Sequence, residues 1–395
     1  MFADFFLPTG ALMKDPVRPR IFAVPRPMIR PSVSTILLLL LILTACADST
    51  GPKDLAPESQ DLIFFVSDAG SAIGGAGETL SDIYVVRGDG SDVRNLTNAP
   101  APVYRELRLS PDASTLAFES DRELCYNVWV MKVDGTDPVR LTGDPFERCN
   151  EMPRWSRDGS RIAFTTSRET IDRSWEVYVM SSDGTGPHNV SDNAGSQATG
   201  WDFPLGWSPD GKVVFDHVTT GGVATFTVSP DGSSLGPLQT LTGGYAPFWS
   251  PNGGKVAFMT GQVGNEGISI MNADGTGLLV LSGAGGGDSF NPGYRANSYH
   301  NPWSPDGSRL AFMSERDGNS EVYVMTAEGA EVVNVSNDPA ADRFDGWSPD
   351  GASLVFSSER RGNWDIYVVN RDGTGLRRLT DGPARDWGAV WVDGG

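Results

Sequence analysis

Trp-Ser-Pro-Asp-Gly at 303–307 opens the stretch 303–336, which decides the fold of this chain. Within this pentapeptide, Pro305 presets φ at the first central position of a tight turn, and Gly307 accepts the left-handed conformation that follows. The rest of the stretch holds short runs of β-branched and aromatic residues, such as Glu-Val-Tyr-Val-Met at 321–325, separated by polar turn residues. Together with a strand ahead of the turn, these runs predict four short antiparallel strands.

The same unit recurs along the chain. Its turn reappears at intervals of roughly 40–55 residues, a period typical of repeats that each form one small sheet. The other copies of the turn stand at 155–159, 207–211, 249–253 and 347–351, and more weakly at 109–113. Four short strands per repeat, with no long helical period between them, describe the blade of a β-propeller.

The two ends of the repeat region complement each other. The stretch 63–66 resembles the second strand of a unit with no first strand before it, whereas 389–392 resembles a first strand with nothing after it. Pairing them would complete one blade and leave no open sheet edge. The sequence therefore predicts an all-β, seven-bladed propeller of four-stranded antiparallel blades over 61–395, in which the C-terminal strand at about 389–392 joins the N-terminal blade at 63–97.

A tryptophan closes the first strand in most units and could suggest a ligand site. It stands at Trp155, Trp207, Trp249, Trp303, Trp347 and Trp391. A residue that nearly every blade repeats is expected to fill the core between blades. For the same reason we expect Arg316 and Arg360 to make repeated salt bridges.

The N-terminal region predicts export and lipid attachment. The apolar run 36–43 follows several basic residues and is too short to cross a bilayer, but it suits the centre of a secretory signal. It ends in Leu-Thr-Ala-Cys at 43–46, which resembles the lipobox of bacterial lipoproteins, in which the cysteine is diacylated. We expect a lipoprotein signal peptide over 1–45, lipidation at Cys46 and a flexible tether over 46–60. The alternative is an ordinary signal peptide with a chance cysteine, and Met1 or Met28 could be the start.

Charge and the resemblance to lipoproteins bear on location and partners. Removal of 1–45 leaves 26 basic and 48 acidic side chains, a net charge of −22. Such a surface repels nucleic acid and anionic headgroups, so attachment to a membrane would come from the lipid at Cys46. The resemblance to lipoproteins, with Ala47 rather than Asp after that cysteine, implies the outer membrane, facing the periplasm.

The repeat itself resembles a known family. Trp-Ser-Pro-Asp-Gly, Leu-Ala-Phe at 310–312, Ser-Glu-Arg-Asp-Gly-Asn at 314–319 and Val-Tyr-Val-Met at 322–325 resemble the repeat of the TolB-like propellers. The resemblance covers roughly 60–395 and implies a propeller of the bacterial envelope.

Two cysteines are predicted to form a disulfide. Cys125 lies in a connection between second and third strands, and Cys149 lies in the next connection between blades, so both fall on the same face of the propeller. An exported chain sits where disulfides persist. No Cys-x-x-Cys spacing supports a redox or metal role for the pair.

The face opposite the signature turns carries the two largest insertions, at 192–204 and 283–301. Insertions in repeats commonly mark a binding surface, and aromatic residues with arginine are typical of recognition patches. The predicted binding rim consists of Trp201, Phe203, Phe290, Tyr294, Arg295, Tyr299, His300, Arg343, Phe344 and Trp387. The alternative is that these aromatic residues fill the centre of the ring or pack between blades.

The sequence offers little support for catalysis. Its three histidines, His188, His217 and His300, fall in different units. We expect no catalytic residue, metal or cofactor, and a monomeric module that binds a protein or peptide partner in the envelope, or a scaffold. The alternative is a carbohydrate-binding or polysaccharide-lyase-like propeller, because oligogalacturonate lyases share related repeats but use a histidine-based metal site.

Overall fold

The structure is a computed structural model of the 395-residue chain. It describes residues 61–69, 80–98, 104–123, 125–143, 148–167, 175–191, 200–219, 222–238, 241, 243–262, 265–283, 287–290 and 300–393. The predicted signal peptide, Cys46 and the tether lie outside the described residues. The sheets all lie within one compact unit, Asp54–Gly395. None of the described segments is a helix with the length and apolar character needed to span a membrane.

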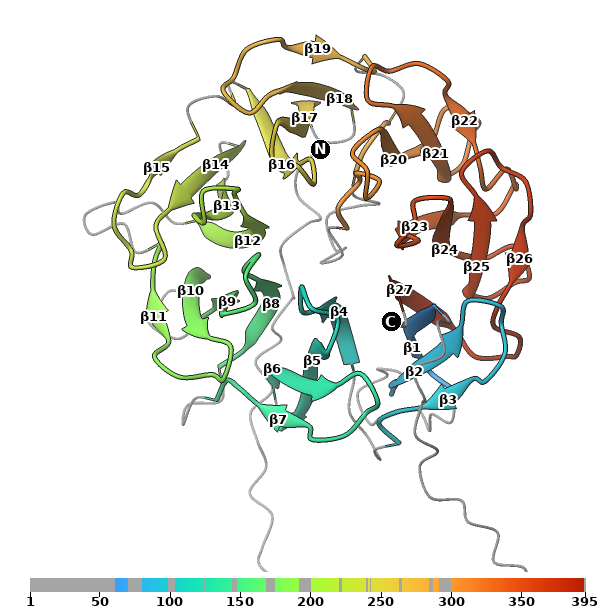
Figure 1. Cartoon of the computed structure of the whole chain (residues 1–395), viewed down its shortest axis with the longest axis horizontal. Helices are drawn as coiled ribbons and strands as arrows, with labels where there is room; N and C mark the ends of the chain where they lie inside the picture. Colours follow the sequence, from blue (N-terminus) through green and yellow to red (C-terminus); the bar gives the residue numbers. More distant parts are fainter. Residues whose placement is uncertain are drawn as a thin grey trace, which may run out of the picture. The chain divides into compact units, whose positions relative to one another are not determined.

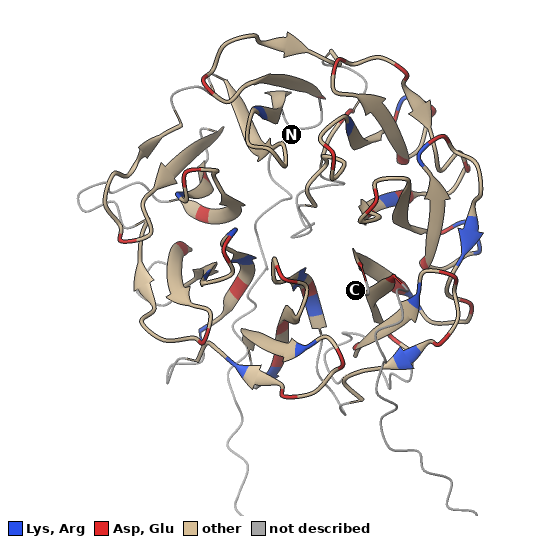
Figure 2. Ribbon diagram, in the orientation of Figure 1, with Lys and Arg blue, Asp and Glu red and all other residues tan. Residues whose placement is uncertain are grey.

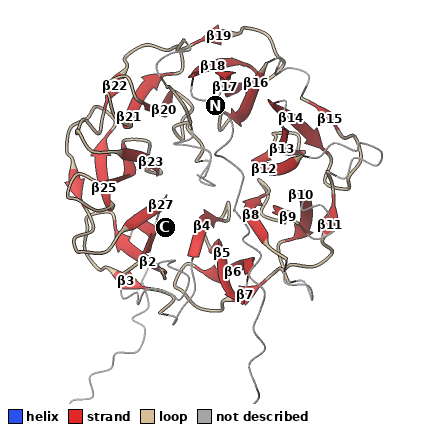
Figure 3. Cartoon of the chain, turned by 180° about the vertical axis from the view of Figure 1, so that it is seen from behind, coloured by secondary structure: helices blue, strands red, loops and turns tan. Residues whose placement is uncertain are grey.

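Seven antiparallel sheets are arranged around one axis (Figure 1), and the described residues contain strands and loops without a helix (Figure 3). From the inner strand outward, blade 1 consists of β27 (Asp386–Val392), β1 (Leu62–Ser67), β2 (Asp82–Arg87) and β3 (Arg94–Asn95). In the same order, blade 2 consists of β4 (Tyr104–Leu109), β5 (Thr115–Glu123), β6 (Cys125–Lys132) and β7 (Val139–Arg140). Blade 3 consists of β8 (Asn150–Trp155), β9 (Arg161–Thr166), β10 (Glu176–Ser181) and β11 (His188–Asn189), and blade 4 of β12 (Trp201–Trp207), β13 (Val213–Thr219), β14 (Gly222–Val228) and β15 (Gly236–Pro237). Blade 5 consists of β16 (Gly244–Trp249), β17 (Lys255–Gln262), β18 (Asn265–Asn272) and β19 (Leu279–Val280). Blade 6 consists of β20 (Arg309–Ser314), β21 (Glu321–Thr326) and β22 (Val333–Asn334). Blade 7 consists of β23 (Asp342–Trp347), β24 (Ser353–Ser358), β25 (Asp365–Asn370) and β26 (Arg377–Arg378).

Blade 1 joins the two ends of the repeat region. β27 pairs antiparallel with β1, with Leu62 opposite Val392, Ile63 opposite Trp391 and Phe64 opposite Val390. Figure 1 shows the two strands, red and blue, side by side in one blade. The seven-bladed fold and its closure by the C-terminal strand are therefore confirmed.

Blade 6 departs from the four-stranded pattern. Its named strands number three, and two isolated bridges, Ser289 to Met313 and Trp303 to Leu310, occupy the place of the inner strand. Asp288 pairs with Arg316 at 2.8 Å, as the equivalent Asp342 pairs with Arg360 in blade 7. The inner strand of blade 6 is thus split, and its two halves flank the insertion 291–299, which lies outside the described residues.

The repeated tryptophans join neighbouring blades, as expected for a structural role. The indole Nε1 of Trp207 donates to the carbonyl of Arg154 in the preceding blade at 3.0 Å, and Trp347 donates to the carbonyl of Pro302 at 2.9 Å. Trp155 and Trp303 make the same contact with Arg108 and Phe248. Each such bond satisfies a backbone carbonyl at the junction between blades.

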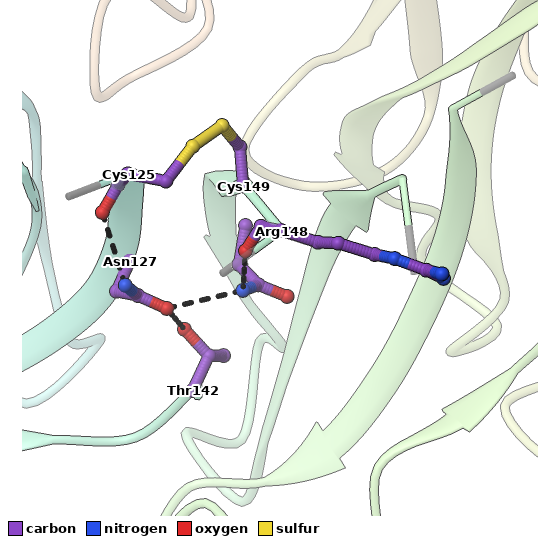
Figure 4. Close-up of a disulfide and its surroundings, with 6 residues drawn as sticks. Cys125, Asn127, Thr142, Arg148 and Cys149 are labelled. Atoms are coloured by element: carbon purple, nitrogen blue, oxygen red, sulfur yellow. Dashed lines mark hydrogen bonds between the residues drawn. A yellow bond between two sulfur atoms is a disulfide. The ribbon is translucent and has the colours of Figure 1, made fainter. Parts of the chain in front are cut away.

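The predicted disulfide is present between Cys125, at the start of β6, and Cys149, just before β8, with Cα atoms 5.1 Å apart. It links blades 2 and 3 (Figure 4). Beside it, the Asn127 side-chain oxygen accepts hydrogen bonds from Thr142 at 3.2 Å and from Asn150 at 3.1 Å. The covalent link and this amide network therefore hold the same junction.

Replacing Cys125 and Cys149 together by serine is expected to lower the free energy of unfolding by about 3 kcal/mol, because the open chain regains loop entropy. Urea unfolding followed by tryptophan fluorescence measures the change. Dithiothreitol should destabilise the wild-type protein to the same extent and leave the double variant unchanged. Equal stability of oxidised and reduced wild-type protein would contradict this expectation.

Candidate binding rim

Seven residues occupy the same register position on the inner face of the seven blades. Each lies opposite the residue that follows the second-strand aromatic: Arg105 opposite Glu119, Glu151 opposite Thr165, Phe203 opposite Asp216, Tyr245 opposite Met259, Ser289 opposite Met313, Arg343 opposite Ser357 and Trp387 opposite Val66. We call these seven inner-strand residues the inner ring. In blades 2, 3, 4, 5 and 7, the ring residue lies near the start of the inner strand and the signature turn follows its end, so the ring is at the opposite end from those turns.

A bulge follows each of several ring positions. Glu106, Met152 and Ala246, the next residues in blades 2, 3 and 5, have φ values of 51°, 59° and 49°, and the strand register shifts there. Gly388 takes the same place in blade 1, with φ of 66°. Such bulges bend a strand and change the direction of its side chains. In blades 1, 2, 3 and 5 the ring residue is therefore the last to pair regularly before the register of the inner strand shifts.

The chemistry of the inner ring differs between sectors. Arg343 in blade 7 and Arg105 in blade 2 are exposed, and Trp387 between them in blade 1 is half-buried. Phe203 and Tyr245, in blades 4 and 5, are also half-buried. A cationic sector with one indole therefore spans blades 7, 1 and 2, and an aromatic sector spans blades 4 and 5.

Both ring arginines stack on an aromatic side chain of their own blade. The guanidinium carbon of Arg105 lies 4.5 Å from the ring centroid of Tyr126, and that of Arg343 lies 4.3 Å from Trp364. Stacking of this kind stabilises a cation over the ring face and limits its rotamers. Both guanidinium groups are thus held in place while remaining exposed.

The aromatic sector continues at the edge of blade 3. Trp175 and Trp201 form a parallel bridge between blades 3 and 4, and the backbone N–H of Asp202 donates to the carbonyl of Trp175 at 2.8 Å. The Asp202 carboxylate lies 2.6 Å from Nδ1 of His217. These contacts fix the backbone from which Trp201 and Phe203 project.

A cluster of charged residues lies on the inner strands of blades 2 and 3, where Figure 2 marks basic and acidic residues close together on β4 and β8. Glu106 pairs with Arg108 at 2.7 Å and with Arg154 at 3.1 Å. Burial lowers the pKa of Arg108 to about 10, against the opposing effect of Glu106. Burial, and then the charges of Arg108 and Arg154, lower the pKa of His300 well below its ordinary value.

His300 belongs to blade 6 and stands just before Trp303, in the second half of the split inner strand. Its Nε2 is buried, and its ring meets Phe344 edge-on at 6.4 Å between centroids. His300 is therefore a neutral, largely enclosed side chain near neutral pH.

Two carboxyls near the disulfide share a buried environment. Glu119 is fully buried, and one of its oxygens accepts the backbone N–H of Met152 at 2.6 Å. Burial, with the negative charges of Glu151 and Glu106, raises the pKa of Glu119 well above its ordinary value. Burial raises the pKa of Glu151 to about 7, although Arg105 opposes this shift. At least one proton is thus held at this junction near neutral pH.

Apart from His300, described above, the predicted rim residues fall into three groups in the structure. Trp201, Phe203, Arg343 and Trp387 lie on the inner ring or beside it, at least partly accessible to solvent. Phe290 and Phe344 are only 4% and 6% exposed, so their assignment to the rim needs correction. Tyr294, Arg295 and Tyr299 lie outside the described residues.

Phe290 and Phe344 are buried because each directly follows a ring position, where the side chain packs against aromatic residues of the core. Phe290 meets Phe248 edge-on at 5.8 Å, and Phe344 meets Trp347 at 6.5 Å. The sequence prediction missed Arg105, Tyr126, Tyr245 and Trp364. Arg105 stands four residues before Leu109, as Arg343 stands four before Trp347, so aligning the units on their signature turns would have found the ring position.

The three histidines make different contacts. His188 is exposed on β11, where its Nε2 lies 2.7 Å from the carbonyl of Pro230, and His217 pairs with Asp202. Among the residues that the structure describes, no group of three or more His, Cys, Asp or Glu side chains is arranged to hold a metal ion.

Replacing Glu119 by Gln is expected to flatten the pH dependence of stability. Both carboxyls have raised pKa values in the folded state and ordinary ones near 4.5 when unfolded. The folded state therefore binds more protons than the unfolded state, and stability falls as pH rises from about 4.5 through about 7. Between about pH 5 and about pH 8, the wild-type protein should lose roughly 1–3 kcal/mol more than the variant, as measured by urea unfolding.

The exposed Glu315 supplies the control, because its replacement by Gln should leave the pH profile unchanged. The amide oxygen of the glutamine introduced in the Glu119→Gln variant can still accept the Met152 N–H, so that variant keeps the hydrogen bond. Parallel profiles for wild type and variant would contradict a protonated pair at this junction.

Comparisons with known proteins agree with this architecture. The family described as "TolB beta propeller domain" matches residues 294–395. An uncharacterized protein of Agrobacterium fabrum is 30% identical over 231 residues, which cover 52% of this chain and 74% of the relative. A TolB homolog of Chlorobium luteolum is 27% identical over 209 residues, covering 51% of this chain and 44% of the homolog, so the chain spans less than half of that protein's length.

One solved structure with a similar fold is the β-propeller domain of the Trilobed protease from Pyrococcus furiosus. It superposes with a TM-score of 0.56 and 11% sequence identity, covering 81% of this chain and 94% of that domain. At this level of identity the similarity shows the fold alone.

Proposed function

Because the chain belongs to the family of TolB-like β-propellers, we propose that it is a non-catalytic module that binds a protein or peptide partner in the bacterial cell envelope. The inner ring carries this proposal. Its arginine and aromatic side chains lie at one end of the inner strands, supported by regular strand pairing. Arginine, tryptophan and tyrosine supply most of the binding energy in many protein interfaces.

The inner ring is rigid, which supports a role in binding. Arg105 and Arg343 are stacked, and the backbone before Phe203 is bonded to Trp175. Side chains that are already ordered lose little conformational entropy when a partner binds. A partner that contacts this end of the propeller would therefore meet a preformed surface.

Attachment to the envelope would come from lipid at Cys46. The sequence 43–46, the apolar run before it and the tether over 46–60 support a lipoprotein whose monomeric propeller lies at the periplasmic face of the outer membrane. The net charge of −19 gives the chain no electrostatic affinity for anionic lipid.

A carbohydrate-binding function is the second candidate, and the aromatic sector favours it. Trp175 and Trp201 lie at the junction of blades 3 and 4. Phe203 and Tyr245, the inner-ring residues of blades 4 and 5, are half-buried. Aromatic faces of this kind could stack on sugar rings as well as pack against apolar side chains.

Replacing Cys46 by Ala should abolish lipid labelling and release the protein from membranes. Incorporation of radiolabelled palmitate in a Gram-negative host measures the modification, and fractionation of the envelope measures the attachment. Export should remain intact, so the Cys125–Cys149 disulfide should still form in the variant. Palmitate labelling of the alanine variant would contradict an anchor at Cys46.

Replacing Phe203 and Tyr245 together by Ala tests the binding function. Crosslinking and pull-down from detergent-solubilised envelopes should recover a stoichiometric protein with the wild type, and the variant should lose at least roughly 90% of it, as expected for hot-spot side chains. A matched control is the replacement by Ala of the exposed residues Leu278, just before the outer strand β19, and Val280, within it.

A glycan array run on the same proteins separates the two candidates. Glycan binding that the Phe203 and Tyr245 replacements abolish, without a protein partner in the pull-down, would favour the carbohydrate function. Recovery of the same protein partner by wild type and variant alike would contradict a role for the ring.

A further inference from the structure

We propose that the partner presents an acidic peptide segment to the cationic sector of the inner ring, with one carboxylate at Arg343, another at Arg105 and an apolar side chain between them over Trp387. This inference rests on the proposed binding function and assigns its partner a chemistry. We call Arg343, Trp387 and Arg105, with the underlying Trp364 and Tyr126, the basic arc.

The three ring residues of the basic arc are neighbours in space. β27, which carries Trp387, packs beside β23 on one side and beside β4 on the other. These strands carry Arg343 and Arg105, at the same register position as Trp387. Closure of the ring through blade 1 therefore places an indole between two guanidinium groups that lie far apart in sequence.

Backbone contacts tie the parts of the arc together. The N–H of Asp386, next to Trp387, donates to the carbonyl of Trp364 at 2.7 Å. Trp364 in turn lies under the guanidinium of Arg343. On the other side, the N–H of Tyr104, next to Arg105, donates to the hydroxyl of Ser81 in blade 1 at 2.9 Å. The positions of both arginines relative to blade 1 are therefore fixed.

Other stacked arginines in the protein show what a structural role looks like. Among the residues that the structure describes, they are Arg122 over Trp129, Arg316 over Tyr323, Arg360 over Tyr367 and Arg385 over Trp387. The guanidinium of each also contacts an oxygen. Arg122 contacts the Tyr104 hydroxyl at 2.7 Å, and Arg316 contacts Asp288 at 2.8 Å. Arg360 contacts Asp342 at 3.2 Å, and Arg385 contacts Asp68 at 2.8 Å. In these four, both the face and the edge of the guanidinium are satisfied within the fold.

Arg105 and Arg343 differ from those four in one respect. Their faces are stacked, they are exposed, and neither forms a salt bridge with a carboxylate of the described residues. A guanidinium edge presents a planar fork of N–H donors that matches a carboxylate in two parallel hydrogen bonds. Two such edges flanking an indole provide charge and apolar contact for an acidic segment.

The remainder of the inner ring lacks this combination. Blades 3 to 6 place Glu151, Phe203, Tyr245 and Ser289 at the equivalent position, so the basic arc is confined to blades 7, 1 and 2. A partner with one acidic segment would therefore bind in a single orientation.

An acidic peptide fits the arc better than a polyanion such as nucleic acid. The chain has a net charge of −19, which repels densely charged polymers at long range. Two isolated guanidinium groups, each held against an aromatic ring, can instead pair with a few carboxylates at short range.

The test uses fluorescence anisotropy with labelled peptides in which two glutamates flank a leucine at varied glycine spacings, and with the matching glutamine peptides. The wild type should bind at least one glutamate peptide and discriminate against its glutamine counterpart. Replacing Arg105 and Arg343 together by Gln should weaken that binding roughly tenfold, the loss expected for two partly exposed ion pairs. Replacing both by Lys should cause an intermediate loss, because the charge remains while the planar fork does not.

The control is Arg157→Gln, which removes one exposed arginine at a signature turn on the opposite face and should leave binding unchanged. Thermal unfolding checks that each variant folds. Equal binding of glutamate and glutamine peptides by the wild type, undiminished binding by the Arg105 and Arg343 double variant, or tighter binding of heparin than of any peptide would overturn the inference.

The envelope pull-down separates this inference from the proposed function. A partner that the Phe203 and Tyr245 variant loses but the Arg105 and Arg343 variant retains would refute the basic arc and leave the binding function standing. A partner lost by the Arg105 and Arg343 variant, and competed away by the glutamate peptide, would support both.

Discussion

Backbone pairing between β1 and β27 is the interaction on which the rest of the structure depends. Without it, blade 1 would lack its inner strand and the edge of β1 would be open. With it, every blade packs against two others, and the second-strand aromatic residues such as Phe118, Phe164 and Phe356 become fully buried. The same pairing brings Trp387 between Arg343 and Arg105, so closure of the fold also completes the basic arc.

The junctions between blades use one geometry with different chemistry. At two junctions the residue after the second-strand aromatic contacts the next inner strand: Glu119 accepts from the Met152 N–H, and Thr165 donates to the Asp202 carbonyl. In blade 7, Ser357 donates instead to the Asp345 carboxylate of its own inner strand. Because the backbone geometry is repeated, the side chains can vary without loss of the fold. This variation gives each sector of the inner ring its own character.

The junction between blades 2 and 3 combines stabilising and destabilising features in one place. The Cys125–Cys149 disulfide and the Asn127 network hold it, while Glu119 and Glu151 place acidic groups where burial disfavours their charge. A covalent link that restricts the unfolded chain offsets part of the cost of burying such a pair. Glu151 also belongs to the inner ring, next to the cationic sector, so its protonation affects the charge presented there.

The sequence by itself determined the blades, because turn chemistry and strand periodicity are local properties that are present in each repeat. It also determined ring closure and the disulfide, since each end of the repeat region and each cysteine has a definite place within a unit. The site was only partly predictable. The predicted rim shares Trp387 and Arg343 with the inner ring but omits Arg105 and Tyr245, and it includes Phe290 and Phe344, which are buried.

Only the tertiary structure decided which aromatic side chains reach solvent. A one-residue step along an inner strand turns a side chain from the exposed ring into the packing between blades, as Arg343 and Phe344 show. The pairing of inner strands from opposite ends of the chain likewise decided which charges lie side by side. Spacing aligns equivalent positions of the repeats, but which side chains reach solvent and which charges become neighbours depends on how separate sheets meet around a common axis.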